Sequence, residues 1–136
     1  MTTADAARVD VDAVAWLTAS SIGEMLRDNA GRIRREMPVY AAVTAATREP
    51  PADPADQVML RGRIDALVPL EDRLVVIDYK TDAIGAEDVS ARAEAYSPQA
   101  HAYADAIERM TGKAVQVILV FLRPRVAHVV ARGDRP

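Results

Sequence analysis

The apolar residues near the start of the chain recur every three or four positions, which is typical of an amphipathic helix. They are Val14, Leu17, Ile22, Met25 and Leu26. Their spacing predicts one helix over about residues 13–29, with Asp12 as its N-cap and Gly31 as its stop signal. The residues before this helix are polar and rich in alanine, so we expect residues 1–11 to form a tail.

The next segment predicts an edge strand. Residues 33–44 are rich in apolar and β-branched side chains, but Pro38 interrupts them. Because proline cannot donate a hydrogen bond to a neighbouring strand, this strand belongs at the edge of a sheet or at a bulge. Residues 48–56 contain three prolines and predict an irregular connection.

Two further strands are predicted to form a hairpin. Residues 58–68 and 74–81 are largely apolar and β-branched, and only a short acidic turn around Glu71 and Asp72 separates them. Strands this close in sequence pair as antiparallel neighbours. We therefore expect these two strands to pair directly.

The second half of the chain predicts a long helix followed by one or two strands. A helical pattern covers about residues 87–110, with Gly112 at its end and Pro98 inside it, where we expect a kink or a split. Residues 115–122 suit a strand that is buried on both faces, and residues 126–131 predict a further edge strand. Because each helix must bury its apolar stripe against the strands, the order predicts an α/β fold with a mixed β-sheet flanked by helices.

Length and composition narrow the class of protein. The 136 residues predict a single domain over about residues 12–131, with a second tail at 132–136. The net charge of −3 argues against a surface that attracts nucleic acid everywhere, but it leaves room for a local basic stripe. The absence of cysteine excludes disulfides, thiolate zinc sites and iron–sulfur clusters. Without a basic, apolar leader or an apolar run that could span a bilayer, we expect a cytoplasmic protein.

The predicted hairpin brings two carboxylates together. If Glu71 and Asp72 form a two-residue loop, the register places Asp65 directly opposite Asp78. Their Cβ atoms would then lie about 4.5 to 5.5 Å apart, and like charges at that distance destabilise a sheet. A divalent cation between the carboxylates would remove this cost, so the pair predicts a metal site.

A lysine joins the two carboxylates. Lys80 follows Asp78 by two residues, so in a strand both side chains point to the same face. Two carboxylates and an ammonium suit phosphodiester hydrolysis, in which a metal polarises the phosphate and a cation offsets charge in the transition state. Ligation by oxygen alone favours Mg²⁺, with Mn²⁺ as a substitute. Taken alone, an Asp-Tyr-Lys sequence is more often part of a surface salt-bridge cluster, and it is the combination with the facing Asp65 and a later Gln-x-x-x-Tyr pattern that favours the catalytic interpretation.

Four segments, in this order and spacing, resemble one family. They are Arg35-Glu36-Met37-Pro38-Val39, Gly62-Arg63-Ile64-Asp65, Ile77-Asp78-Tyr79-Lys80-Thr81-Asp82, and the helical pair Gln99 and Tyr103. The chain resembles the nuclease domain of AddAB- and RecBCD-type helicase-nucleases, a branch of the PD-(D/E)XK superfamily, over about residues 11–121. AddB-like nuclease domains carry a four-cysteine iron–sulfur cluster, so a chain without cysteine is more similar to the AddA or RecB type.

This resemblance implies a fold, an activity and a set of site residues. The fold would be restriction-endonuclease-like, and the activity would be that of a Mg²⁺-dependent exonuclease module in double-strand break repair. Asp65 and Asp78 would bind the metal together with the main-chain carbonyl of Tyr79, and Lys80 would be the catalytic lysine. The residues that would support the site or contact DNA are Glu36, Arg63, Asp82, Gln99 and Tyr103.

The resemblance also implies partners. The substrate would be DNA, single-stranded where a helicase delivers it. The helicase module would lie upstream or in another chain, because this domain is too short to contain a motor. An AddB- or RecC-like subunit would complete the assembly.

One feature departs from the family. The family supplies a further metal ligand, often a histidine, from a helix upstream of the first helix predicted here. Both histidines of this chain, His101 and His128, come after Lys80. We therefore expect the chain to be the C-terminal part of a nuclease domain, in which Glu36 or Glu24 replaces that ligand. Glu36 is favoured because its strand lies next to the hairpin in the family.

Two other interpretations follow from this departure. A nuclease-fold domain without the upstream ligand would serve as an inactive scaffold that docks a partner or contacts DNA. A fragment without its first helices would be marginally stable alone and would expose an apolar patch where they pack.

Overall fold

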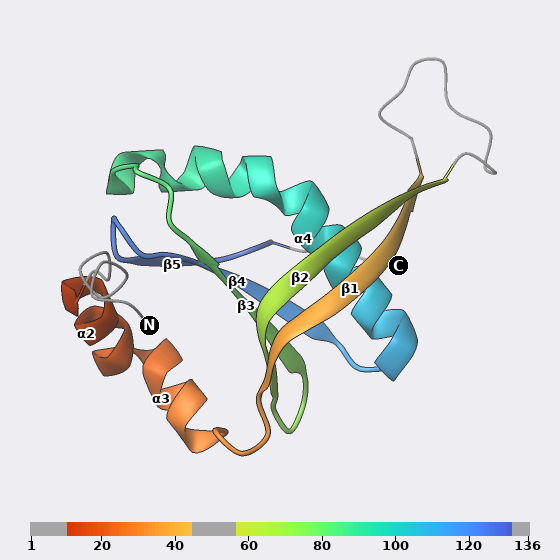
Figure 1. The fold of residues 1–136 in the computed structure, drawn as a ribbon, viewed down its shortest axis with the longest axis horizontal. Helices are drawn as coiled ribbons and strands as arrows, with labels where there is room; N and C mark the ends of the chain where they lie inside the picture. Colours follow the sequence, from red (N-terminus) through yellow and green to blue (C-terminus); the bar gives the residue numbers. More distant parts are fainter. Residues whose placement is uncertain (1–10, 45–56, 132–136) are drawn as a thin grey trace, which may run out of the picture.

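A mixed sheet of five strands forms the middle layer of the structure (Figure 1). The structure is a computed structural model, and it describes residues 11–44 and 57–131. The strands, in their order across the sheet, are β1 (Arg34–Thr44), β2 (Gln57–Pro69), β3 (Leu74–Lys80), β4 (Val115–Phe121) and β5 (Val126–Val129). β3 and β4 are parallel, and the other neighbouring pairs are antiparallel. The helices are α2 (Val11–Ala19), α3 (Ser21–Asp28) and α4 (Val89–Thr111), and a 3₁₀ turn (Ala86–Asp88) leads into α4. The predicted α/β fold with a mixed sheet is confirmed.

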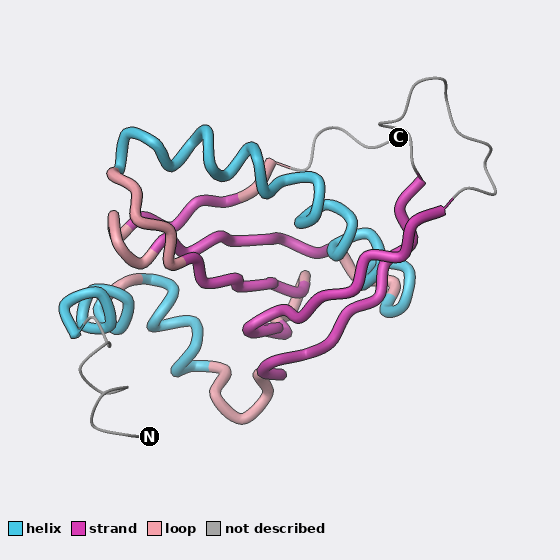
Figure 2. The backbone as a smooth tube through the Cα atoms, turned by 45° about the horizontal axis from the view of Figure 1, so that its top comes forward, coloured by secondary structure: helices cyan, strands magenta, loops and turns pink. Residues whose placement is uncertain are grey.

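Helices cover both faces of the sheet (Figure 2). On one face, Ile107 of α4 belongs to the same buried cluster as Val76 and Leu119 of the sheet. On the other face, Ile22 of α3 belongs to the same buried cluster as Ile77 of β3. Because successive residues of a strand point to opposite faces, the residues of β3 that follow Val76 at intervals of two also point towards α4.

The first helical segment is two helices, and the prediction of a single helix over residues 13–29 is wrong. The chain turns at Ser20, whose hydroxyl accepts a hydrogen bond from the Gly23 N–H at 3.3 Å and so caps α3. A Cβ at Gly23 would collide with the Leu17 carbonyl oxygen, so the two helices meet at a corner that only glycine fits. Asp12, predicted as an N-cap, lies within the first turn of α2.

The β2–β3 hairpin has the predicted register. The Leu70 N–H donates a hydrogen bond to the Arg73 carbonyl oxygen at 2.8 Å across the two-residue loop. The ladder between the strands runs from this loop to Ala66. Asp65 is the next residue of β2 beyond this ladder, and its carboxylate lies close enough to Asp78 to interact with it by hydrogen bonding and charge.

β2 changes the face that it presents at Asp65. Ile64 and Leu67 are three residues apart, yet both belong to the buried cluster under α4, whereas Ala66 belongs to the cluster on the other face. In a regular strand, residues three apart point to opposite faces, so Ile64 and Leu67 could not both lie under α4. The strand therefore twists locally at Asp65. At the same level of β1, Glu36 has a positive φ of 50°.

Beyond this twist, β1 and β2 extend past the other strands as a two-stranded unit, which we call the β1–β2 ribbon (residues 37–44 and 57–64; Figure 1). β1 is an edge strand, as Pro38 predicted, and Pro38 pairs in register with Arg63. The irregular connection predicted at residues 48–56 lies outside the described residues.

The second half of the chain largely follows its prediction. α4 is continuous through Pro98, so the expected split does not occur, although Figure 1 shows its axis bending. Gly112 ends the helix with a φ of 70°. β4 is almost entirely buried and β5 is the second edge strand.

The ends of the chain were predicted as tails, and residues 1–10 and 132–136 lie outside the described part of the structure. Within residues 11–44 and 57–131, no helix is both long and apolar enough to cross a membrane.

Candidate active site

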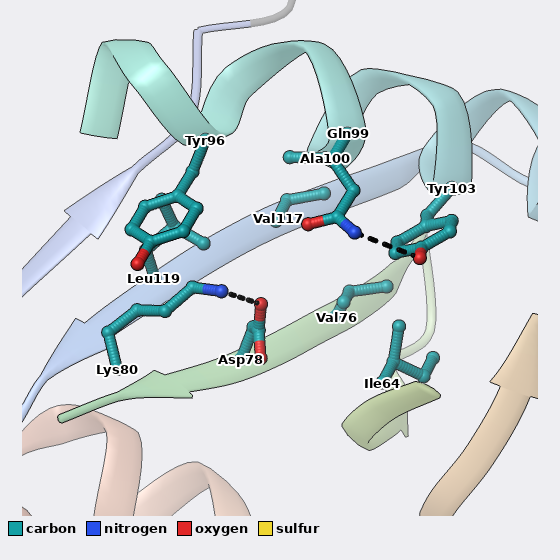
Figure 3. Close-up of a pocket in the computed structure, with 10 residues that line it drawn as sticks. All are labelled: Ile64, Val76, Asp78, Lys80, Tyr96, Gln99, Ala100, Tyr103, Val117 and Leu119. Carbon is teal, nitrogen blue, oxygen red and sulfur yellow. Dashed lines mark hydrogen bonds and ion pairs between the residues drawn. The ribbon is translucent and has the colours of Figure 1, made fainter. Parts of the chain in front are cut away.

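The carboxyl end of β3 and the facing side of α4 enclose a small pocket (Figure 3). Its lining residues come from both layers: Ile64, Val76, Asp78, Lys80, Tyr96, Gln99, Ala100, Tyr103, Val117 and Leu119. Its volume is about 10 Å³, which is room for about one water molecule. Polar groups thus gather at one end of an otherwise apolar interface.

Asp78 and Lys80 form an ion pair at the end of β3. The Lys80 Nζ lies 2.9 Å from the Asp78 Oδ2, and the two side chains are 15% and 27% exposed. Their spacing of two residues puts both on the α4 face, as predicted. The lysine is therefore held near the surface, with its ammonium directed into the site.

Asp65 completes the predicted trio. Its Oδ2 accepts a hydrogen bond of 2.7 Å from the Tyr79 N–H, so the carboxylate turns from β2 towards β3. Burial raises the pKa of Asp78; hydrogen bonding and charge from Lys80 lower it, while Asp65 raises it by both effects. The site therefore carries more negative charge than its lysine balances.

Tyr96 supports the lysine from α4. The Lys80 Nζ lies 3.9 Å from the centroid of the Tyr96 ring, within the range of a cation–π contact. The Tyr96 hydroxyl donates to the Asp82 carboxylate, with distances of 2.9 and 3.1 Å to its two oxygens. Burial, followed by the hydrogen bond and charge of Asp82, raises the pKa of Tyr96.

Asp82 acts behind this tyrosine. Its side chain is 12% exposed and also forms an ion pair with Arg92, at 3.1 Å. The structure thus places Asp82 as an anchor for Tyr96 and not as a residue that lines the pocket.

The sequence analysis missed Tyr96, although a signal was present. Tyr96, Gln99 and Tyr103 recur at intervals of three and four residues, which places them on one face of a helix. All three line the pocket.

Gln99 and Tyr103 form the far wall of the pocket. The Gln99 Nε2 donates a hydrogen bond of 3.1 Å to the Tyr103 hydroxyl. The Tyr103 side chain is buried over Gly62 of β2, and a Cβ at position 62 would overlap its hydroxyl group. Gly62 therefore allows α4 to approach the sheet at this point.

The remaining predicted residues lie around the trio. Glu36 is exposed on β1, at the level of Asp65 in the register. Arg63 is exposed on β2. Glu24, the alternative to Glu36, is exposed on α3, a helix that packs on the opposite face of the sheet. Position therefore favours Glu36 over Glu24.

Among the described residues, histidines and acidic residues do not extend the Asp65–Asp78 pair into a larger metal-binding cluster. Nowhere in the described ranges do three or more histidine, aspartate or glutamate side chains converge as a metal-binding group. His101 bonds instead to the Ala131 carbonyl oxygen, with its Nε2 at 2.7 Å. Asp65 and Asp78 are thus a pair of oxygen donors, and Glu36 is the nearest acidic residue in the register.

Comparison with known proteins gives a consistent result. A model of the PD-(D/E)XK nuclease superfamily matches residues 4–133. The chain is 35% identical over 124 residues to an AddA-type ATP-dependent helicase/nuclease subunit from Desulforudis audaxviator, and 34% identical over 114 residues to its namesake from Clostridioides difficile. These matches cover 90% and 76% of this chain but 10% and 9% of the relatives. The chain thus spans about a tenth of the length of these curated relatives.

Among solved structures, the chain aligns with the crystal structure of SSO0001. The TM-score is 0.45 and the sequence identity is 12%. The alignment covers 96% of this chain and 54% of that chain.

Proposed function

Because the chain belongs to the PD-(D/E)XK nuclease superfamily and is homologous to AddA-type helicase/nuclease proteins, we propose that it hydrolyses phosphodiester bonds at Asp65, Asp78 and Lys80. The observation that carries this proposal is the meeting of two carboxylates and one ammonium at the end of β3. A surface salt-bridge cluster does not explain it, because a second carboxylate beside a partly buried ion pair adds uncompensated charge.

The two carboxylates fit a divalent metal ion. Asp65 and Asp78 offer hard oxygen donors, and their mutual repulsion is a cost that a cation relieves. We propose Mg²⁺ as the ion, with Mn²⁺ as a substitute, and Glu36 and the Tyr79 carbonyl as further ligands. When bound, such an ion supplies Lewis-acid activation of the scissile phosphate.

Lys80 provides the complementary positive charge. Its ammonium is held between the Asp78 carboxylate and the Tyr96 ring, so little motion is needed to offer a hydrogen bond to a phosphate oxygen. A preformed cation stabilises charge that develops in the transition state without a cost of reorganisation. Gln99 and Tyr103 support the wall behind this position, and Asp82 holds Tyr96.

We propose DNA as the substrate and an exonuclease module as the biological role. The names of the relatives support this setting: both are ATP-dependent helicase/nuclease subunits. In this proposed role, a helicase outside the described chain delivers a single strand of DNA to the site. An AddB- or RecC-like subunit completes the assembly, and the complex processes double-strand breaks.

The direct test uses the two lysines of the chain, Lys80 and Lys113. We expect a labelled single-stranded DNA to be cut in Mg²⁺ or Mn²⁺ but not in EDTA, and Lys80→Ala to reduce the rate by about 10²- to 10³-fold. Lys113→Ala removes the same charge from an exposed position outside the pocket and should leave the rate unchanged. Equal rates for Lys80→Ala and the wild type would refute the proposal.

A second candidate function is a non-catalytic scaffold of nuclease fold. It is favoured by one observation: among the described residues, no third acidic or histidine side chain converges with Asp65 and Asp78. Titration calorimetry separates the two functions. Heat of Mg²⁺ binding that disappears in Asp78→Asn supports the nuclease, whereas no binding at millimolar Mg²⁺, in a chain that melts cooperatively, supports the scaffold.

A further inference from the structure

An aromatic side chain is exposed on the β1–β2 ribbon, away from the pocket. Tyr40 is 57% exposed, although its neighbour Val39 is 4% exposed and belongs to the core cluster under α4. Alternation along β1 therefore places the Tyr40 ring on the outer face of the ribbon, where no described helix covers it. The ring is therefore accessible to a ligand that approaches the ribbon from outside.

Arginines accompany this ring. Tyr40 is paired in register with Arg61, and the Arg61 guanidinium carbon lies 5.9 Å from the Tyr40 ring centroid. Pro38 and Arg63 form the next pair on the same face, and Arg63 is also exposed. Residues two apart on a strand are separated by about 6.6 Å, so the two arginines form a short stripe beside the ring.

The stripe runs towards the candidate active site. Asp65 follows Arg63 by two residues and bonds to the Tyr79 N–H at the end of β3. The pairs Tyr40–Arg61 and Pro38–Arg63 contain no carboxylate. In a chain with a net charge of −3, these two pairs form a local positive surface, and Asp65 lies two residues further along β2.

We propose that the outer face of the β1–β2 ribbon binds a single strand of nucleic acid, with one base stacked on Tyr40 and the adjoining phosphates on Arg61 and Arg63. Aromatic rings beside basic side chains hold single strands without regard to sequence, because every base has a π-face and every nucleotide a phosphate. That the bound nucleic acid runs towards Asp65 rests on the proposed nuclease function. That the ribbon binds nucleic acid does not depend on that function.

A purely structural explanation makes a different prediction. Cross-strand pairs of this kind also stabilise a two-stranded ribbon. If Tyr40 and Arg61 did only this, their removal would lower the melting temperature and leave the affinity for DNA unchanged in the folded protein.

The test is fluorescence anisotropy of a labelled oligothymidine with the full chain in EDTA, so that binding is measured without cleavage. Tyr40→Ala is expected to weaken binding by roughly tenfold, and Tyr40→Phe, which keeps the ring, to bind like the wild type. Arg61→Ala should weaken binding and reduce the slope of log K against log salt by about 0.7. Arg109→Ala removes an exposed charge from α4 and is the matched control.

Three results would overturn the proposal: no binding by the wild type, unchanged affinity in both Tyr40→Ala and Arg61→Ala, or an equal loss in Arg109→Ala. Thermal melting of each variant confirms that the protein measured is folded. Because anisotropy is measured in EDTA, where no cleavage occurs, the oligothymidine affinity does not depend on whether the chain cuts DNA in Mg²⁺. A failure of the nuclease function is thus distinguishable from a failure of the strand-binding ribbon.

Discussion

Lys80 and Asp65 both lie beside Asp78, but the fold supports them in different ways. The lysine has three layers of support: the Asp78 carboxylate at 2.9 Å, the Tyr96 ring at 3.9 Å, and the Asp82 carboxylate that holds the Tyr96 hydroxyl. The Asp65 carboxylate accepts a hydrogen bond from a main-chain N–H, and it meets the Asp78 carboxylate, a group of like charge, through hydrogen bonding and charge.

The lysine is positioned by the fold itself, whereas the two carboxylates repel each other until a cation binds. The position of the lysine is set by packing between the sheet and α4, before any substrate is present. The carboxylates are brought together by the register of a hairpin, against their repulsion. A charge pair that is costly in the folded protein becomes favourable once a cation binds, which is the behaviour expected of a binding site and not of a structural ion pair.

The largest effect is expected when the carboxylate side is broken. Asp65→Asn keeps the size of the side chain but removes one charge, so we expect cleavage of single-stranded DNA in Mg²⁺ to fall by roughly 10²-fold or more, the effect of losing one transition-state contact. Asp72→Asn changes an exposed carboxylate in the hairpin loop and serves as the control. Full activity in Asp65→Asn would show that the Asp65 carboxylate is not required for cleavage.

A smaller effect is expected when the support of the lysine is broken. Tyr96→Leu removes the ring that contacts Lys80, and we expect a rate loss of about tenfold, whereas Tyr96→Phe keeps the ring and most of the rate. The KM for DNA should change little, because the variant alters the position of Lys80 and not the binding surface.

An NMR measurement checks this positioning independently of activity. Labelling of lysine reports only Lys80 and Lys113. The side-chain protons of Lys80 should be shifted upfield by the ring current in the wild type and in Tyr96→Phe but not in Tyr96→Leu, with Lys113 as the internal reference. A Lys80 signal that does not respond to Tyr96→Leu would contradict the contact between Lys80 and the Tyr96 ring.

The smallest effect concerns stability. Because burial and Asp65 raise the pKa of Asp78 above its ordinary value of 3.8, the folded state holds this proton more tightly than the unfolded state. Stability should therefore fall as the pH rises from that ordinary value through the raised pKa. Thermal melting in EDTA should show this fall in the wild type and a weaker one in Asp78→Asn. Identical pH profiles would mean that the folded protein does not raise the pKa of Asp78.

Much of this architecture follows from local sequence rules. The two-residue loop at Glu71 and Asp72 determines the hairpin register, and that register brings the Asp65 and Asp78 carboxylates together just beyond the end of the ladder. The edge position of β1 follows from Pro38, and the end of α4 follows from Gly112. Each of these features depends on neighbours within a few residues.

The features that could not be predicted depend on how separate elements meet. The apolar spacing continues through Ser20, so the break between α2 and α3 is visible only from the cap and the tight contact at Gly23. Tyr96 was missed because its contact with Lys80 exists only after α4 packs across the end of β3.

The irregular backbone of β1 has a consequence for association between molecules. An unprotected edge strand presents a row of main-chain donors and acceptors on which another strand can pair, the usual start of β-aggregation. Along β1, Pro38 has no N–H to offer, and Glu36 leaves the extended conformation with its φ of 50°. At the opposite edge, β5 has only four residues. These are features by which natural edge strands discourage pairing with a neighbouring molecule, so we expect the protein not to associate through the edges of its sheet.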